Sequence, residues 1–233
     1  MTDSRYRARF GAASRVFIVV HAEDAGQAGR NAAIAHDAGA DGVFLINHAI
    51  SSDALRPIVA QARARWPAWF IGANCLDRTP AESIALLGSL VDAIWSDDAL
   101  VDERVAAQPE AAAIVAAQRQ HAPDALHFGG VAFKYRRTVD DLVAACHAAV
   151  PYVDVVTTSG PGTGMAADVA KIRTMRAALG QAPLAIASGI TPENVGAYLP
   201  YADAFLVATG VSVSFTELDA AKVTRLVERV RAG

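Results

Sequence analysis

Residues 183–210 read PLAIASGITPENVGAYLPYADAFLVATG, and this stretch decides the fold. One apolar run ends in Ser188-Gly189, and a second ends in Thr209-Gly210. Between the two runs, Thr191-Pro192 predicts the start of a helix, because Thr is a favoured N-cap and Pro is favoured at the first helical position. Two strands joined by a helix form a βαβ unit, which predicts a parallel sheet.

The preceding chain repeats this alternation of apolar runs and amphipathic segments. The apolar runs are continuous, as is typical of strands covered on both faces, and they predict strands at residues 16–21, 41–47, 69–75, 92–96, 125–135 and 154–159. Helices follow each run, and two of them begin with capping-box residues, Asp24 with Gln27 and Thr79 with Glu82. Eight strand–helix units predict a single (β/α)8 TIM barrel formed by residues 16–233. Residues 1–15 are expected to be a loose leader that packs across the barrel bottom or against a partner.

A shared aspartate opens each even-numbered strand. These residues are Asp41, Asp92, Asp154 and Asp203. Successive members lie 51, 62 and 49 residues apart, which indicates a recurring quarter-barrel unit. Positions at the N-terminal ends of barrel strands serve stability more than chemistry. We therefore interpret these aspartates as structural.

Composition and charge indicate which kinds of binding partner and which cellular compartment are compatible with the sequence. The formal net charge of the 233 residues is −3, and without a basic stripe we expect no nucleic-acid partner. Every apolar run is broken within about ten residues, so we expect no membrane partner. The first residues lack the apolar stretch of a secretory signal, and Cys75 and Cys146 lack metal-ligand spacing. These features predict a cytoplasmic protein with reduced thiols and no bound cofactor.

Polar residues follow the predicted strands at their C-terminal ends, where chemistry occurs in a TIM barrel. Lys134 follows the apolar segment GGVAF, so its amine has a lowered pKa and acts as a base or nucleophile, or it pairs with a carboxylate or a substrate anion. Asp97 is a candidate general acid or base, and only one of the adjacent pair Asp97 and Asp98 can face inward. His21 is a candidate acid/base residue, a hydrogen-bonding core residue or, with Asp97 and Asn47, a weaker candidate metal ligand. The sequence holds no tight metal motif, so we expect no metal site.

Small residues at the ends of the last two strands predict a phosphate site. Backbone N–H groups of Gly189 and Gly210, together with the hydroxyl groups of Ser188 and Thr209, are suited to hold an anion. The alternative is that both glycines only relax tight turns. The sequence GPGTG at residues 160–164 follows the sixth strand, so it is no dinucleotide fingerprint, but it can bind an anion or close over a substrate. Further candidate substrate-binding residues are Asn47, Asn74, Thr158, Thr163 and Gly164.

Most of the barrel sequence resembles the BtpA-like family, the BtpA/SgcQ group of TIM-barrel proteins, and the resemblance is strongest over the last third of the chain. The matching motifs are Thr163-Gly164, the turn Ser188-Gly189-Ile190-Thr191-Pro192-Glu193-Asn194, and Ala202-Asp203. The sequence departs from the family at Ile46, where members carry glutamate, and after His21, where members carry a Pro/Leu-rich loop. The same turn is similar to those of phosphoribosylanthranilate isomerase and of thiamine-phosphate synthase relatives. The resemblance implies a phosphorylated ligand held by the last two βα loops.

Two hypotheses of different classes follow. The first is an isomerase, epimerase or lyase acting on a small phosphorylated metabolite, a sugar phosphate, with Lys134 and Asp97 as its acid/base pair. The second is a non-catalytic assembly or regulatory factor that retains the anion site. By analogy with other TIM barrels we expect a homo-oligomer.

Overall fold

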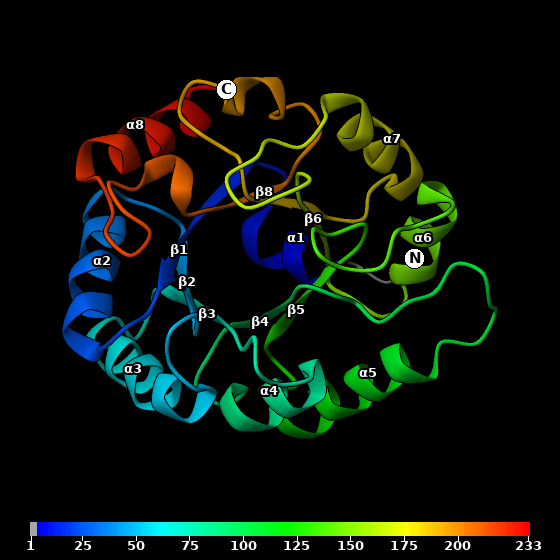
Figure 1. The fold of residues 1–233 in the computed structure, drawn as a ribbon, viewed down its shortest axis with the longest axis horizontal. Coiled ribbons are helices and arrows are strands. Elements are labelled where there is room, and N and C mark those ends of the chain that lie inside the picture. The colour runs from blue at the N-terminus through cyan, green and yellow to red at the C-terminus, as the bar shows by residue number, and fades with distance from the viewer. Residues whose placement is uncertain (1–3) are drawn as a thin grey trace.

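A closed barrel of eight parallel strands forms the centre of the computed structural model, which describes residues 4–233 (Figure 1). Each strand pairs with its neighbours in chain order, and β8 pairs with β1 to close the barrel. The strands are β1 (Arg15–His21), β2 (Gly42–Ile46), β3 (Phe70–Asn74), β4 (Ala93–Ser96), β5 (Leu126–Gly130), β6 (Val155–Thr158), β7 (Leu184–Ala187) and β8 (Ala204–Val207). The predicted TIM-barrel fold is confirmed.

Helices surround the barrel and connect successive strands (Figure 1). They are α2 (Ala25–Asp37), α3 (Ser52–Arg65), α4 (Pro80–Leu87), α5 (Pro109–His121), α6 (Leu142–Ala149), α7 (Val169–Leu179) and α8 (Ala220–Arg231), with short 3₁₀ turns η1 (Val195–Ala197) and η2 (Thr209–Val211). Among residues 4–233, none of the helices is both long and apolar enough to cross a membrane.

Side-chain alternation divides the core into two parts. Outward-facing aliphatic side chains of the strands pack against the helices, whereas inward-facing aromatic side chains fill the barrel. Phe17, Phe44 and Phe128 are fully buried there, and the Phe44 and Phe128 rings meet edge to face with centroids 5.3 Å apart. The same alternation determines which polar side chains at the C-terminal ends of the strands point into the barrel.

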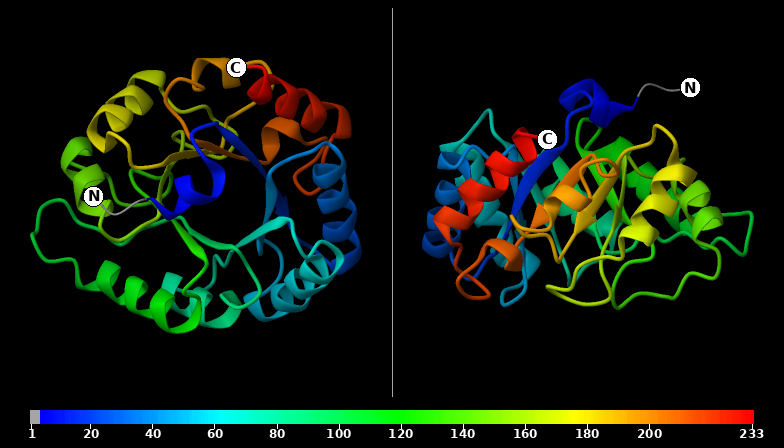
Figure 2. Two further views of the ribbon diagram at one scale, coloured as in Figure 1. Left: turned by 180° about the vertical axis from the view of Figure 1, so that it is seen from behind. Right: turned by 90° about the horizontal axis from the view of Figure 1, so that it is seen from above.

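Helix α1 (Arg5–Phe10) covers the N-terminal end of the barrel, as Figure 2 shows from behind and from above. Tyr6 is fully buried, packs its ring edge-on against Phe128 at 6.1 Å, and donates a hydrogen bond to the Asp203 carbonyl oxygen at 2.8 Å. Residues 5–10 pack across the barrel bottom, as expected, but they form a helix and are not loose, because their apolar side chains extend the aromatic core. Residues 1–3 of the expected leader lie outside the described residues.

The four repeated aspartates hold residues 5–15 against the N-terminal end of the barrel. Each accepts a hydrogen bond, at 2.8–2.9 Å, from the backbone N–H group of the preceding strand, from Val16, Ile71, His127 and Leu184 in turn. Each also pairs with an arginine of residues 5–15: Arg15 with Asp41, Arg9 with Asp92, Arg5 with Asp154 and Arg7 with Asp203. The structural interpretation of the aspartates is confirmed.

Three local expectations are wrong. Strand β5 ends at Gly130, and residues 131–135, which the sequence predicts to belong to this strand, begin a loop that runs to residue 141. After β7 the chain forms only a hydrogen-bonded turn and η1: Thr191 Oγ1 accepts from the Asn194 N–H group as expected of a cap, but no α-helix follows. Gln27 completes no capping box, because its side chain bonds to Glu23 and to the carbonyl oxygens of His21 and Thr216.

Candidate functional site

The C-terminal ends of the strands form the open end of the barrel, here called the mouth. Inward-facing positions place His21 of β1, Asn74 of β3 and Asp97, which follows β4, on the same interior face as Phe17, Phe44 and Trp95. Asn74 Nδ2 donates a hydrogen bond of 3.0 Å to Asp97 Oδ1. Three of the predicted site residues therefore lie together at the mouth.

Asp97 and its neighbour Asp98 have different roles. Burial raises the pKa of Asp97 above its ordinary value, against the opposing effects of the Asn74 hydrogen bond, Arg136 and Lys134. The nearest Arg136 nitrogen lies 3.9 Å from Asp97 Oδ2. Asp98 Oδ1 instead accepts a hydrogen bond from the Leu100 N–H group at 2.9 Å. Asp97 is the carboxylate that faces the mouth, as strand alternation predicts for one of the pair.

Lys134 lies in the β5–α6 loop, not on the strand itself. Its backbone N–H group donates to Ser159 Oγ at 2.8 Å, and its amine lies 5.7 Å from the centre of the buried Phe133 ring. Burial lowers the pKa of the Lys134 amine, although Asp97 favours its charged form. Within residues 4–233, no carboxylate oxygen comes within 4.0 Å of this amine.

His21 stacks on Phe215, with ring centroids 4.1 Å apart, and its Nδ1 lies 2.9 Å from the Phe215 carbonyl oxygen. Burial lowers the pKa of His21 to about 4. His48 meets both rings edge-on, at 5.0 Å from His21 and 5.1 Å from Phe215. Burial also lowers the pKa of His48. His21 is thus neutral near pH 7, which lets its Nδ1–H group donate to the carbonyl oxygen.

The predicted phosphate-site residues meet at the ends of β7 and β8. A Cβ atom on Gly189 would lie 2.2 Å from the Met165 carbonyl oxygen, and one on Gly210 would lie 1.8 Å from that of Ile190. Close packing within the chain therefore requires both glycines, which is the alternative that the sequence left open. In the described part of the chain, neither glycine N–H group donates a hydrogen bond to the protein.

The β6–α7 loop, residues 159–168, lies across this region. Ser188 Oγ donates to the Gly162 carbonyl oxygen at 3.2 Å, and a Cβ on Gly164 would lie 3.4 Å from Thr209 Oγ1. The Thr163 N–H group donates to the Tyr135 hydroxyl group at 3.2 Å. Figure 1 shows this yellow-green loop passing over the barrel beside β6 and β8. Thr163 and Gly164 are thus brought to the predicted phosphate site and connected to the Lys134 loop.

Asn47 and Thr158 face away from the mouth. Asn47 Nδ2 donates to Asp77 Oδ1 at 2.7 Å, and its Oδ1 accepts from the Leu76 N–H group at 2.7 Å. Thr158 is fully buried, and its hydroxyl group donates to the Ala132 carbonyl oxygen at 3.4 Å. Asn47 directly follows β2 and Thr158 ends β6, and both side chains point to the outside of the barrel. Their hydrogen bonds stabilise the adjoining loops.

Sequence reasoning missed three residues that contribute to the mouth. The alternation that turns Asn47 outward directs His48 inward, so the residue period could have identified His48. Arg136 and Phe215 lie on loops whose paths no local pattern predicts. Phe215 reaches His21 across 194 residues of sequence.

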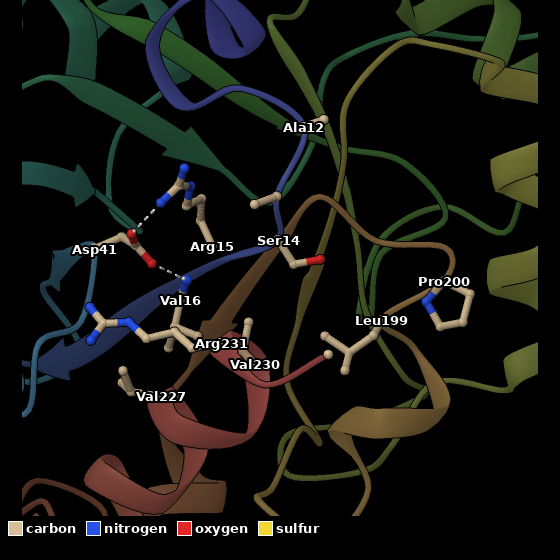
Figure 3. Close-up of a pocket in the computed structure, with 12 residues that line it drawn as sticks. Ala12, Ser14, Arg15, Val16, Asp41, Leu199, Pro200, Val227, Val230 and Arg231 are labelled. Atoms are coloured by element: carbon tan, nitrogen blue, oxygen red, sulfur yellow. Dashed lines mark hydrogen bonds and ion pairs between the residues drawn. The ribbon is translucent and has the colours of Figure 1, made fainter.

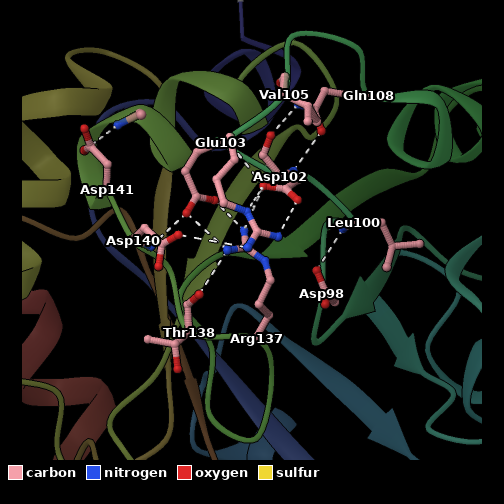
Figure 4. Close-up of polar contacts among 12 residues, drawn as sticks. Asp98, Leu100, Asp102, Glu103, Val105, Gln108, Arg137, Thr138, Asp140 and Asp141 are labelled. Atoms are coloured by element: carbon pink, nitrogen blue, oxygen red, sulfur yellow. Dashed lines mark hydrogen bonds and ion pairs between the residues drawn. The ribbon is translucent and has the colours of Figure 1, made fainter.

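An ion-pair network holds the loop that carries Lys134 (Figure 4). Arg137 donates to Glu103 Oε1 at 3.1 Å, and its Nη2 lies 3.7 Å from Asp102 Oδ1. The Asp140 N–H group donates to Glu103 Oε1 at 2.8 Å. The β5–α6 loop is therefore anchored to the β4–α5 loop through Glu103 and to β6 through Ser159. A cavity of about 230 Å³ between the two loops reaches Asp97 and Arg136.

Backbone strain gathers at the same end of the barrel. The non-glycine residues with positive φ in residues 4–233 all lie in loops at the mouth, and they are Leu100 (54°), Ala132 (48°), Tyr135 (60°) and Ser188 (88°). Such conformations cost about 1–3 kcal/mol each and cluster at functional sites. Across the described residues, no group of three or more His, Cys, Asp or Glu side chains is arranged to hold a metal ion.

A pocket of about 470 Å³ lies at the opposite end of the barrel (Figure 3). It lies between the segment before β1 and helix α8, and its lining includes the Arg15–Asp41 ion pair and the apolar side chains of Leu199, Val227 and Val230. Its charged groups already pair with one another or with the backbone. The mouth therefore remains the candidate site.

Comparisons with known proteins agree with the fold. No protein-family model matches the sequence, and no curated protein matches it. Phosphoribosyl anthranilate isomerase from Thermus thermophilus has a similar structure, with TM-score 0.66 and 19% identity over 94% of this chain and 98% of that one. Tryptophan synthase subunit alpha from Legionella pneumophila gives TM-score 0.70 and 11% identity over 99% and 97%. Thiamine phosphate pyrophosphorylase from Pyrococcus furiosus gives 0.64 and 14% over 94% and 96%. At these identities the likeness establishes a shared TIM-barrel fold.

Proposed function

We propose that this protein is an isomerase, epimerase or lyase that acts on a small phosphorylated metabolite such as a sugar phosphate. The observation that carries the proposal is the cluster of Asp97, Lys134, His21 and His48 at the mouth. Burial moves the pKa of Asp97 up and that of Lys134 down. A group whose pKa is displaced toward neutral pH is suited to exchange protons with a substrate near pH 7.

Each residue of the cluster has a role in this proposal. Asp97, oriented by Asn74, gives or takes a proton, and the Lys134 amine does so on the other side of the substrate. His21 and His48 present neutral rings that orient polar substrate groups, while Phe215 covers the His21 ring. Asn47 and Thr158, whose polar atoms bond within the chain, are left out of the proposed site.

The phosphate group is proposed to bind at the ends of β7 and β8. Free N–H groups at Gly189 and Gly210, with the Thr209 hydroxyl group, suit a dianion. In TIM barrels the loops after these two strands frequently hold phosphate. Two of the similar structures are named for phosphorylated compounds, phosphoribosyl anthranilate and thiamine phosphate. One such isomerase is described in complex with a reduced deoxyribulose 5-phosphate derivative.

The relation to the BtpA-like family is part of the proposal. It rests on the turn at residues 188–194 and on the motifs of strands 6 and 8. A cytoplasmic location and a homo-oligomeric state are proposed on composition and on fold analogy, respectively. Size-exclusion chromatography with light scattering tests the oligomeric state.

Calorimetric titration tests the phosphate site. Inorganic phosphate and a panel of sugar phosphates are titrated, each beside its dephosphorylated form. Thr209→Glu places a carboxylate at the proposed site, and we expect affinity for phosphorylated ligands to fall at least about tenfold through like-charge repulsion. Thr209→Val removes the hydroxyl group without adding charge and is the matched control. Substitution of Gly189 is unsuitable, because any Cβ there collides with Met165.

The outcomes are distinct. Binding that depends on the phosphate group and falls much further in Thr209→Glu than in Thr209→Val supports the proposal. Equal affinity in wild type and Thr209→Glu contradicts the position of the phosphate. Phosphate-dependent binding without turnover of any ligand would favour the non-catalytic regulatory factor.

A further inference from the structure

We propose that Lys134 is a covalent catalyst whose amine forms a Schiff base with the carbonyl carbon of a phosphorylated aldehyde or ketone. This inference rests on the proposed function and specifies its substrate class and reaction. It follows from the position of the Lys134 amine, which has no partner among residues 4–233, beside Asp97 and against Phe133, in a loop held before and after Lys134.

The lysines of this chain are rare and differ in their surroundings. Three lysines stand among the 21 basic residues, and the rest are arginines, which cannot lose a proton to become nucleophiles. Lys171 donates to the carbonyl oxygens of Ala132 and Ser159, at 2.7 and 2.9 Å. Lys222 donates to the Ser212 carbonyl oxygen at 3.1 Å and lies 3.9 Å from Asp219. Lys134 alone has an amine that bonds to no other group of residues 4–233.

Lys171 fixes the backbone before Lys134 and the residue after β6 to which Lys134 bonds. The Ala132 carbonyl lies two residues before Lys134, and Ser159 accepts the hydrogen bond from the Lys134 N–H group. Arg137 and Glu103 anchor the loop beyond Lys134. An amine that must attack at a defined angle benefits from a rigid backbone, because its position is set before the substrate arrives.

The surroundings favour the neutral amine that the reaction needs. Burial against Phe133 lowers the Lys134 pKa, which raises the neutral fraction near pH 7. The paired alternative, in which Lys134 only neutralises Asp97, requires an ion pair. Lys134 and Asp97 form none within 4.0 Å, although Asp97 lies close enough to influence the Lys134 pKa.

The step balances without any further reagent. The Nζ lone pair forms a bond to the carbonyl carbon while the C=O π electrons move to oxygen, which takes up a proton. A second proton then converts that hydroxyl group into water, which leaves as the C=N bond forms. The two hydrogens lost from the amine equal the two carried away by water. Asp97, with its raised pKa, is placed to relay these protons.

Borohydride trapping tests the inference. Wild-type protein is incubated with glycolaldehyde phosphate or dihydroxyacetone phosphate, reduced with sodium borohydride, digested and mapped by mass spectrometry. We expect a stable secondary-amine adduct on Lys134, at least about tenfold above that on Lys222, because only Lys134 combines a free amine with a lowered pKa. The sequence contains three lysines, so mass spectrometry can compare the yield of the adduct at every lysine of the chain.

Lys134→Arg is the matched variant, since it retains the positive charge but cannot form an imine. It should lose the adduct while binding phosphorylated ligands in calorimetry, and Lys222→Arg should retain the Lys134 adduct. Adducts confined to Lys171 or Lys222, or a Lys134 yield no higher than in urea-unfolded protein, would overturn the inference. If phosphorylated ligands bind under those same conditions, the proposed function survives without the imine step. If calorimetry shows no phosphate-dependent binding, yet Lys134 is trapped, the carbonyl chemistry stands and the phosphate site does not.

Discussion

At the scale of a single residue, His21 shows how burial sets a charge state at the mouth. The ring is 8% exposed and stacks on Phe215, and its pKa is lowered to about 4. The unfolded chain binds the same proton with a pKa near 6.5, the ordinary value for histidine. Between these two values the unfolded state binds more protons, so folding stability falls as the pH falls.

This difference predicts the pH dependence of unfolding. Lowering the pH from 6.5 to 4 should cost about 3 kcal/mol of unfolding free energy through His21 alone. His21→Asn keeps an N–H donor for the Phe215 carbonyl but does not titrate, so its stability should depend less on pH in this window. Urea unfolding at several pH values measures the difference between the two proteins. Parallel pH profiles for variant and wild type would contradict the assigned pKa.

At the scale of an element, α1 is a six-residue helix that depends on the barrel for its stability. Ser4 caps its start, and the Gly11 N–H group ends it on the Arg7 carbonyl oxygen. An isolated helix this short is unstable in water, so its structure comes from contacts with the strands. Tyr6 supplies buried aromatic surface, and the arginines supply hydrogen bonds to carboxylates.

Substitutions at Tyr6 separate these contributions. Tyr6→Ala should lower the unfolding free energy by about 3–5 kcal/mol, because it leaves a cavity over Phe128. Tyr6→Phe should cost only about 1 kcal/mol, since it removes the hydrogen bond to Asp203 but keeps the ring. Denaturant unfolding measures both, with the exposed Arg56→Ala of α3 as the control. Equal effects of Tyr6→Ala and Arg56→Ala would mean that α1 does not contribute to the core.

At the scale of the whole molecule, the ion pairs that support the fold and the proposed site lie at opposite ends of the barrel. The N-terminal end contains the aspartate–arginine pairs, whereas the mouth contains the strained loops and the titratable cluster. Asp203 is 7% exposed and binds both Arg7 and Arg176, each within 2.8 Å. Changes at one end should therefore affect a different measurement from changes at the other.

A pair of variants tests this separation. Asp203→Asn should lower the unfolding free energy by about 3 kcal/mol, because two arginines lose their carboxylate partner. Ligand affinity measured well below the unfolding temperature should not change. Thr209→Glu should weaken phosphate binding and leave the unfolding midpoint nearly as it is. A loss of affinity in folded Asp203→Asn would show that the two ends are coupled.

The sequence predicts the barrel well because strand–helix alternation is a local property repeated eight times. It also separates Asp97 from Asp98, since side chains of a strand alternate. It fails at residues 131–135, which are predicted to continue the strand but form a loop from which Phe133 packs inside the barrel. Contacts such as His21 with Phe215 depend on loop paths over 194 residues, which local patterns do not encode.

The contact between Tyr6 and Asp203 spans 197 residues, and this separation constrains the order of folding. The first helix of the chain cannot dock until β8 has paired with β1, the last pairing along the chain. Contacts so distant in sequence form slowly, because the intervening chain must lose its entropy first. Until then Phe17, Phe70 and Phe128 lack the rings of Tyr6 and Phe10 that cover them, and an incomplete chain exposes an aromatic surface. We therefore expect docking of α1 to be a late step, and ribosome-bound chains that lack β8 to depend on chaperones.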